Sequence, residues 1–166
     1  MFTHLLFNDN NLFTVKFSDY AKNHYLKRFE KDYKGRQWDI TAESICQDMM
    51  RIKTTNSDLQ KTQQVDELWH KGNYWIFKYD FRVAQTKEST KSSGNRCVAF
   101  LDNAANRIEI LIIFGKGDLP KNIGEQAFIA QTLDENFRDY LSLARYTDER
   151  LHFRHLWLDP GSSLHL

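Results

Sequence analysis

Charged side chains alternate along one predicted strand of this sequence, over residues 73–84. Lys78, Asp80 and Arg82 fall on the same face of that strand, because successive side chains of a strand point to opposite faces. After a polar loop, Arg96 begins the second predicted strand. Lys116 lies at the end of the third predicted strand, which covers residues 107–116. An arginine fork can bind two phosphate oxygens, and a lysine among other cations can act as a base. The spacing therefore predicts a sheet face that attracts a polyanion and can act on its phosphates.

The positive charge of the chain is concentrated in this segment. The formal net charge is only +1, yet residues 71–96 contain six Lys or Arg against two Asp or Glu. Lys71, Lys87 and Lys91 belong to this excess and are expected to help hold the polyanion. A solvated sheet face with cross-strand ion pairs is the alternative interpretation, since such pairs are common and weak.

Strand and helix patterns surround these residues. Trp75, Phe77, Tyr79 and Phe81 share the apolar face of the first of three consecutive strands, and the third strand is apolar almost throughout. Ser18 is expected to cap a first helix that ends at Gly35, with apolar residues four apart. The remaining expected elements are a strand at 12–17, a second helix from Asp39 to 52, a loop at 53–73 with a helical turn near 65–69, strands at 96–102 and 107–116, and a helix opened by Asn122 and Glu125 that continues toward Ala144.

Length and composition favour one globular domain. The chain has 166 residues, 41% of them hydrophobic, which is enough for a single core. We expect the domain to span residues 1–146, with 147–166 as a C-terminal extension packed on it. No leader or spanning segment is indicated, and Cys46 and Cys97 are typical of buried thiols in a reducing cytoplasm. The sequence therefore predicts a cytoplasmic protein that does not engage a membrane.

Motifs for nucleotide loops, nucleophile elbows and zinc sites are lacking in the sequence. His152 and His155 have a spacing that can ligate a metal, but no third ligand is placed near them, and ordinary packing is the favoured interpretation. The acids of the predicted sheet, Asp80, Asp102 and Glu109, are spread over different strands and faces. We therefore expect neither a metal nor a cofactor.

The order of these elements resembles the RelE/ParE superfamily of toxins from type II toxin–antitoxin systems. The resemblance covers roughly residues 12–136 and lies in 74–82, in Ser93-Gly94-Asn95-Arg96, and in 111–116. It implies an α+β, RelE-like fold in which a mainly antiparallel four-stranded sheet packs against an N-terminal helical hairpin, with a C-terminal helix. The sequence departs from the family at Asn95, where an aromatic residue is common, in its longer loop before Arg96, and in its C-terminal extension.

The resemblance also implies a reaction. In the ribonuclease branch of the family, the sheet cuts messenger RNA, usually on the ribosome, by attack of a ribose 2′-hydroxyl. The family's cations fall on Lys78, Arg82, Arg96 and most nearly Lys116. Arg82 and Arg96 would stabilise the transition state, Lys78 would position the ribose or act as base, and Lys116 would serve the phosphate or leaving group. Asp80 is either an alternative base or a partner of Arg82.

Other functions and a protein partner follow from the same resemblance. The ParE branch inhibits DNA gyrase without nuclease activity, and a non-catalytic RNA-binding or scaffold protein could keep the same sheet. A toxin of this family is held inactive by a cognate antitoxin protein, often through an acidic or helical segment on the basic face. The expected partners are therefore an antitoxin and messenger RNA.

Overall fold

The computed structural model describes residues 12–54, 59 and 62–140 of the chain. The predicted extension at 147–166, with His152 and His155, lies outside these residues. In chain order the elements are β1 (Thr14–Phe17), α1 (Asp19–Ala21), a π-helical turn (Lys22–Leu26), α2 (Lys27–Asp32), α3 (Gln37–Met50), β2 (Val65–Lys71), β3 (Tyr74–Phe81), β4 (Asn95–Asp102), β5 (Arg107–Phe114), a 3₁₀ turn (Lys116–Asp118) and α4 (Glu125–Asn136).

The described strands form one five-stranded sheet in the order β1-β5-β4-β3-β2. β1 pairs with β5 in parallel, and every other neighbouring pair is antiparallel. The α+β class and the mixed, mainly antiparallel sheet are confirmed, whereas the prediction of four strands is wrong. The additional strand is β2, in a segment predicted to be a loop. Its pairing with β3 shifts register between Glu67 and Trp69, so the alternation that marks a strand is interrupted.

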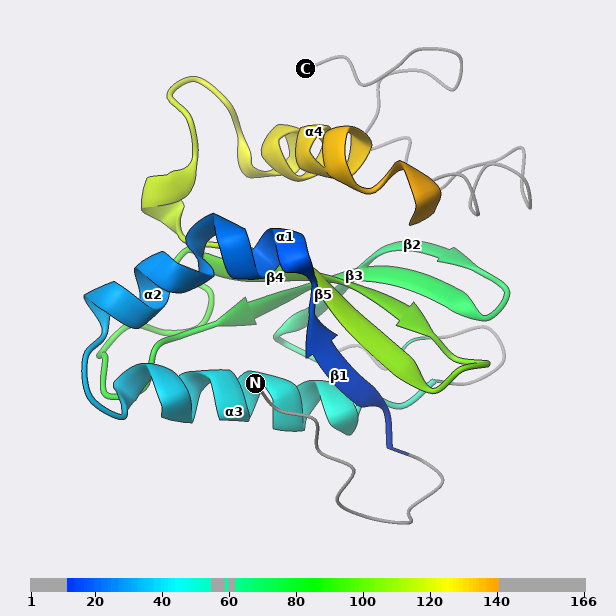
Figure 1. Ribbon diagram of the computed structural model, residues 1–166, viewed down its shortest axis with the longest axis horizontal. Coiled ribbons are helices and arrows are strands. Elements are labelled where there is room, and N and C mark those ends of the chain that lie inside the picture. The colour runs from blue at the N-terminus through cyan, green and yellow to red at the C-terminus, as the bar shows by residue number, and fades with distance from the viewer. Residues whose placement is uncertain (1–11, 55–58, 60–61, 141–166) are drawn as a thin grey trace.

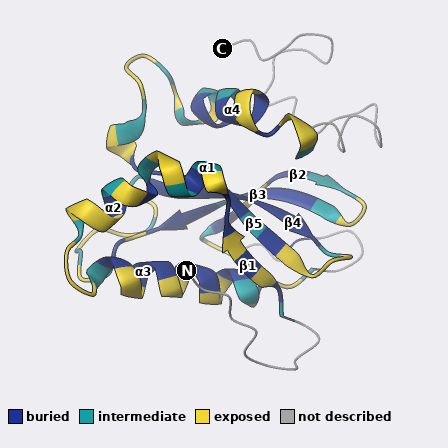
Figure 2. Cartoon of the chain, in the orientation of Figure 1, coloured by how far each residue is buried: buried dark blue, intermediate teal, exposed yellow. Residues whose placement is uncertain are grey.

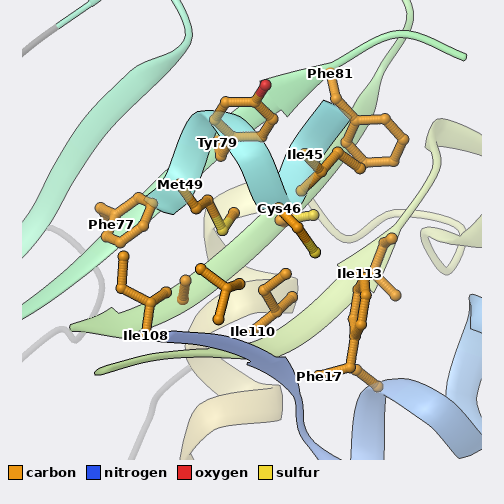
Figure 3. Packing of buried hydrophobic residues seen from close by; sticks show 14 of the residues in the cluster. Phe17, Ile45, Cys46, Met49, Phe77, Tyr79, Phe81, Ile108, Ile110 and Ile113 are labelled. Atoms are coloured by element: carbon orange, nitrogen blue, oxygen red, sulfur yellow. The ribbon is translucent and has the colours of Figure 1, made fainter. Parts of the chain in front are cut away.

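Two helices cover the two faces of the sheet (Figure 1). Figure 2 shows buried residues on the sides of α3 and α4 that turn toward the strands. The predicted apolar face of β3 lies on the α3 side, which confirms the register expected from the sequence. Figure 3 shows Cys46 and Met49 of α3 among the sheet side chains of this cluster. Its members from β3 are Trp75, Phe77, Tyr79 and Phe81.

The opposite face of the sheet packs against α4 and is less open than the sequence suggested. Ile76, Val98 and Phe114 belong to a second apolar cluster that includes Phe128 and Leu133 of α4. Lys78 and Asp80 share this face, and Asp80 is buried. The expected solvated charged face is therefore partly covered by a helix, because β4 and β5 present apolar side chains on both of their faces.

The first helix begins as expected but does not run to Gly35. Ser18 caps it, accepting a hydrogen bond from Ala21 N at 3.0 Å and donating to Leu111 O at 2.9 Å. The helix is interrupted at Tyr25, whose φ is +72°.

The start of α4 also differs from the prediction: Asn122 has a positive φ, and Gly124 instead of Asn122 is the residue that precedes the helix. Within the described residues, no helix is long and apolar enough to cross a membrane.

Candidate functional site

A cluster of ion pairs lies where β3 and β4 meet the first turn of α4. Asp80 of β3 is directly opposite Arg96 of β4, and Lys78 lies two residues earlier on the same face. Glu125, the first residue of α4, reaches both cations: its Oε1 is 2.8 Å from Arg96 Nε and its Oε2 is 3.1 Å from Lys78 Nζ. Asp66 of β2 lies 3.7 Å from Lys78 Nζ at the rim. One carboxylate thus spans two fixed cations.

Arg96 is held rigidly by the loop that precedes it. Its Nη1 donates to the carbonyls of Asn95 at 3.0 Å and Thr90 at 3.3 Å, and its Nη2 donates to that of Lys91 at 3.0 Å. Arg96 is only 8% exposed. The guanidinium therefore presents its Nε edge to the cluster, while its other nitrogens are occupied by the backbone.

Asp80 is the least satisfied group of the cluster. Its Oδ1 lies 3.0 Å from Arg96 Nε, yet that N–H donates to Glu125, so Asp80 Oδ1 is buried without a hydrogen bond within the described chain. Burial raises the pKa of Asp80, and the positive charges of Arg96 and Lys78 offset part of that rise. A carboxyl of this kind is a candidate proton acceptor.

Lys116 lies against the same loop but outside the ion pairs. Gly94 has a φ of +73°, and a Cβ there would be 2.5 Å from Lys116 Cβ, so only glycine allows this approach. The turn that carries Lys116 is fixed by Asp118, which accepts from Gly115 N at 2.6 Å and pairs with Arg28 of α2. Lys116 itself is exposed.

The structure gathers two of the four predicted catalytic cations into one cluster. Lys78 and Arg96 lie together under Glu125, and Lys116 is exposed outside their cluster. Arg82 lies just beyond the end of β3, where the alternation of the strand no longer applies, and it lines a pocket on the α3 side of the sheet instead of sharing the face of Lys78 and Asp80. Asp80 pairs with Arg96, and Arg82 forms no ion pair within the described residues. Of the cations expected to bind RNA, Lys87 and Lys91 are exposed on the loop before β4, and Lys71 is half-buried at the distant end of β2.

Sequence reasoning missed the role of Glu125. The sequence pattern places Glu125 only at the start of a helix, together with Asn122. Its partners Arg96 and Lys78 are 29 and 47 residues away along the chain. No local pattern encodes such a contact. Among the described residues, no three His, Cys, Asp or Glu side chains are grouped to hold a metal ion.

Comparison with protein-family models, curated proteins and solved structures finds no match to this chain. Its function is therefore inferred from the site and from the resemblance of its sequence.

Proposed function

We propose that this protein is the toxin of a type II toxin–antitoxin system and cleaves messenger RNA in the cytoplasm without a metal ion. The observation that carries the proposal is the position of Glu125, whose two oxygens join Lys78 and Arg96. A phosphodiester also offers two charged oxygens, so the pair of cations is spaced to bind one phosphate once Glu125 moves aside. The resemblance to the RelE/ParE superfamily supports RNA as the source of that phosphate.

Each member of the cluster has a distinct task in the proposed reaction. Asp80, whose pKa is raised by burial, accepts the proton of the attacking 2′-hydroxyl. Arg96 and Lys78 stabilise the charge that develops on the phosphate. Lys116, exposed beside Gly94, serves the leaving 5′-oxygen or the next phosphate, and Arg82, Lys87 and Lys91 hold the strand outside the cluster. The product carries a 2′,3′-cyclic phosphate, because the nucleophile belongs to the substrate.

A non-catalytic RNA-binding protein is the second candidate. It is favoured by the same ion pairs, since Glu125, Asp80 and Asp66 neutralise both cations of the cluster. In that case RNA would contact only the exposed cations Arg82, Lys87, Lys91 and Lys116.

Translation in vitro with mapping of message ends tests the proposed activity. We expect new 5′ ends in the message, cyclic or 3′-phosphate termini, and cleavage that persists in EDTA when ribosome integrity is controlled. Intact message with blocked DNA supercoiling would instead indicate a ParE-like gyrase inhibitor. Intact message that is bound by the protein would indicate the non-catalytic alternative.

Growth tests the proposed partner. Expression of the chain alone should slow growth, and co-expression of the product of the neighbouring gene should restore it. The exposed cations of the loop before β4 provide a surface for an acidic antitoxin segment. Unimpaired growth at high levels of soluble protein would contradict the toxin assignment.

Glu125→Gln should tighten RNA binding roughly threefold to tenfold, because it removes a charged competitor worth about 1 kcal/mol from the two cations. Glutamine can still accept from Arg96, but its amide nitrogen cannot accept from Lys78. The measurement is fluorescence anisotropy with a 2′-O-methyl RNA, which cannot be cleaved. Glu135→Gln, an exposed change on the same helix, is the matched control. Equal affinities for the two variants would mean that Glu125 does not occupy a phosphate site.

A further inference from the structure

A cavity lies on the other face of the sheet, away from the ion-pair cluster. It has a volume of about 380 Å³, is open to solvent on one side, and is lined by α3, the end of β3 and the loop that follows β3. A smaller hollow of about 170 Å³ adjoins it, and the two share Asp48, Gln64 and Tyr79 in their walls. The side chains of Tyr79 and Phe81 point to this face, whereas Lys78 and Asp80 point to the face under α4.

The walls of the cavity are fixed by hydrogen bonds between α3 and the loop. Gln37 Nε2 donates to Ala84 O at 2.7 Å, and Ala84 N donates to Thr41 Oγ1 at 2.8 Å. Thr86 Oγ1 donates to Val83 O at 2.6 Å and closes the turn. These bonds fix the walls of the cavity, and its volume lies within the range of small-molecule sites.

Two charged groups of the lining, the carboxylate of Asp48 and the guanidinium of Arg82, can contact a ligand in this cavity. Tyr79 donates its hydroxyl hydrogen to Asp48 Oδ2, and burial raises the pKa of Tyr79, which keeps it a neutral donor. Asp48 is an exposed residue of the lining, and its Oδ1 receives no hydrogen bond from the described residues. Arg82, at the other side of the lining, is exposed and makes no ion pair with them. A ligand that contacts both groups would bring N–H donors for Asp48 and an anion for Arg82.

We propose that this cavity binds a guanosine monophosphate unit, with its phosphate on Arg82 and its base edge on Asp48. Guanine carries two adjacent N–H donors, N1–H and N2–H, and a carboxylate accepts such a pair well. Ile40, which is 40% exposed, provides apolar surface for one face of the base, and Thr86 and Thr90 belong to the lining on the side of the loop.

The surrounding charge favours phosphate over carboxylate as the anion. Lys87 and Lys91 are exposed on the same loop as Thr86 and Thr90, so the entrance carries a positive field. A free amino acid could also pair with Asp48 and Arg82, but its single carboxylate charge gains less from this field than a phosphate monoester does, and it would leave much of the volume unfilled. The nucleotide can be free in solution or part of an RNA strand, and only the second source rests on the proposed function.

Isothermal titration calorimetry with guanosine, adenosine, cytidine and uridine monophosphates tests the proposal. We expect guanosine monophosphate to bind with a dissociation constant of roughly 1 mM or lower and the other three more weakly. Arg82→Ala should weaken binding at least about tenfold, because it removes a charge-assisted contact to phosphate. Ser44→Leu, a change at an exposed position that lines the cavity, should block it by filling space.

Arg107→Ala is the matched control, since Arg107 is an exposed arginine at the opposite end of the sheet. It should leave nucleotide affinity unchanged. Asp48→Asn keeps an acceptor for Tyr79 but turns an amide donor toward the ligand, so the preference for guanine should disappear. A 2′-O-methyl RNA with a single guanine, titrated in parallel, identifies the strand as the source if it binds and guanosine monophosphate does not.

The inference is overturned if neither probe binds, if lysine or glutamate binds in place of the nucleotides, or if binding survives both Arg82→Ala and Ser44→Leu. Binding of guanosine monophosphate by a protein that leaves messenger RNA intact would support the inference and contradict the proposed cleavage. The two proposals therefore fail separately.

Discussion

Arg96→Ala should lower the rate of RNA cleavage by roughly 10²–10³-fold, the effect of losing one preorganised charge stabiliser. Arg96 is oriented by three backbone carbonyls before any substrate arrives, so it requires no rearrangement to meet the developing phosphate charge. Single-turnover cleavage of a short RNA at saturating protein measures the effect on chemistry rather than on binding.

Arg96→Lys should recover only part of this loss. A lysine keeps the positive charge but cannot bind Glu125 or a phosphate while also donating to the carbonyls of Asn95, Thr90 and Lys91. Arg107→Ala, the exposed arginine at the other end of the sheet, should cleave at the wild-type rate. An Arg96→Ala protein with full activity would remove this cluster from the reaction, although the fold would stand.

Folding must be measured beside activity in this experiment. Arg96 lies 3.0 Å from buried Asp80, and its removal leaves that carboxyl without its nearest cation. Breaking a buried pair in this way typically costs about 3–5 kcal/mol. Circular dichroism and urea unfolding therefore fix a temperature at which both proteins are fully folded, and rates are compared there.

The register of β3 could be predicted from the sequence because the pattern that sets it is local. Phe77, Tyr79 and Phe81 alternate with Lys78 and Asp80, and burying the aromatic face leaves a single acceptable register. Lys78 and Asp80 then fall on one face by geometry alone, and Arg96 lies opposite Asp80 once β3 and β4 pair.

The contacts that set the chemistry of the cluster are tertiary and could not be predicted in this way. Glu125 joins the cluster only because α4 packs across the sheet, and Asp80 is buried for the same reason. β2 escaped detection because a bulge interrupts its alternation. The contacts of Glu125 and the burial of Asp80 therefore depend on residues distant in sequence, whereas β2 is missed because its local pattern is irregular.

The break at Tyr25 shows the same limit within one helix. The spacing of Ala21, Tyr25 and Phe29 predicts a single apolar stripe. In the structure Phe29 belongs to the apolar cluster on the α3 side, whereas Tyr25 packs against both clusters and meets Phe128 of α4 with ring centroids 6.4 Å apart. A continuous helix cannot direct one stripe to both layers, so the chain adopts a positive φ at Tyr25, which is costly for a residue other than glycine.

Phe77→Ala should lower the free energy of unfolding by about 3–5 kcal/mol, the usual cost of truncating a buried aromatic residue. Phe77 is fully buried on the α3 side of the sheet, in the same apolar cluster as Met49 of α3 and Ile108 of β5 (Figure 3). A loss of that size is a large fraction of the stability of a typical domain. Urea unfolding followed by circular dichroism measures it. Ile40→Ala, at a hydrophobic residue of α3 that is 40% exposed, should change stability by no more than about 0.5 kcal/mol. If the two variants were equally stable, Phe77 would not face the core, and the register that places Lys78 and Asp80 in the ion-pair cluster would be wrong.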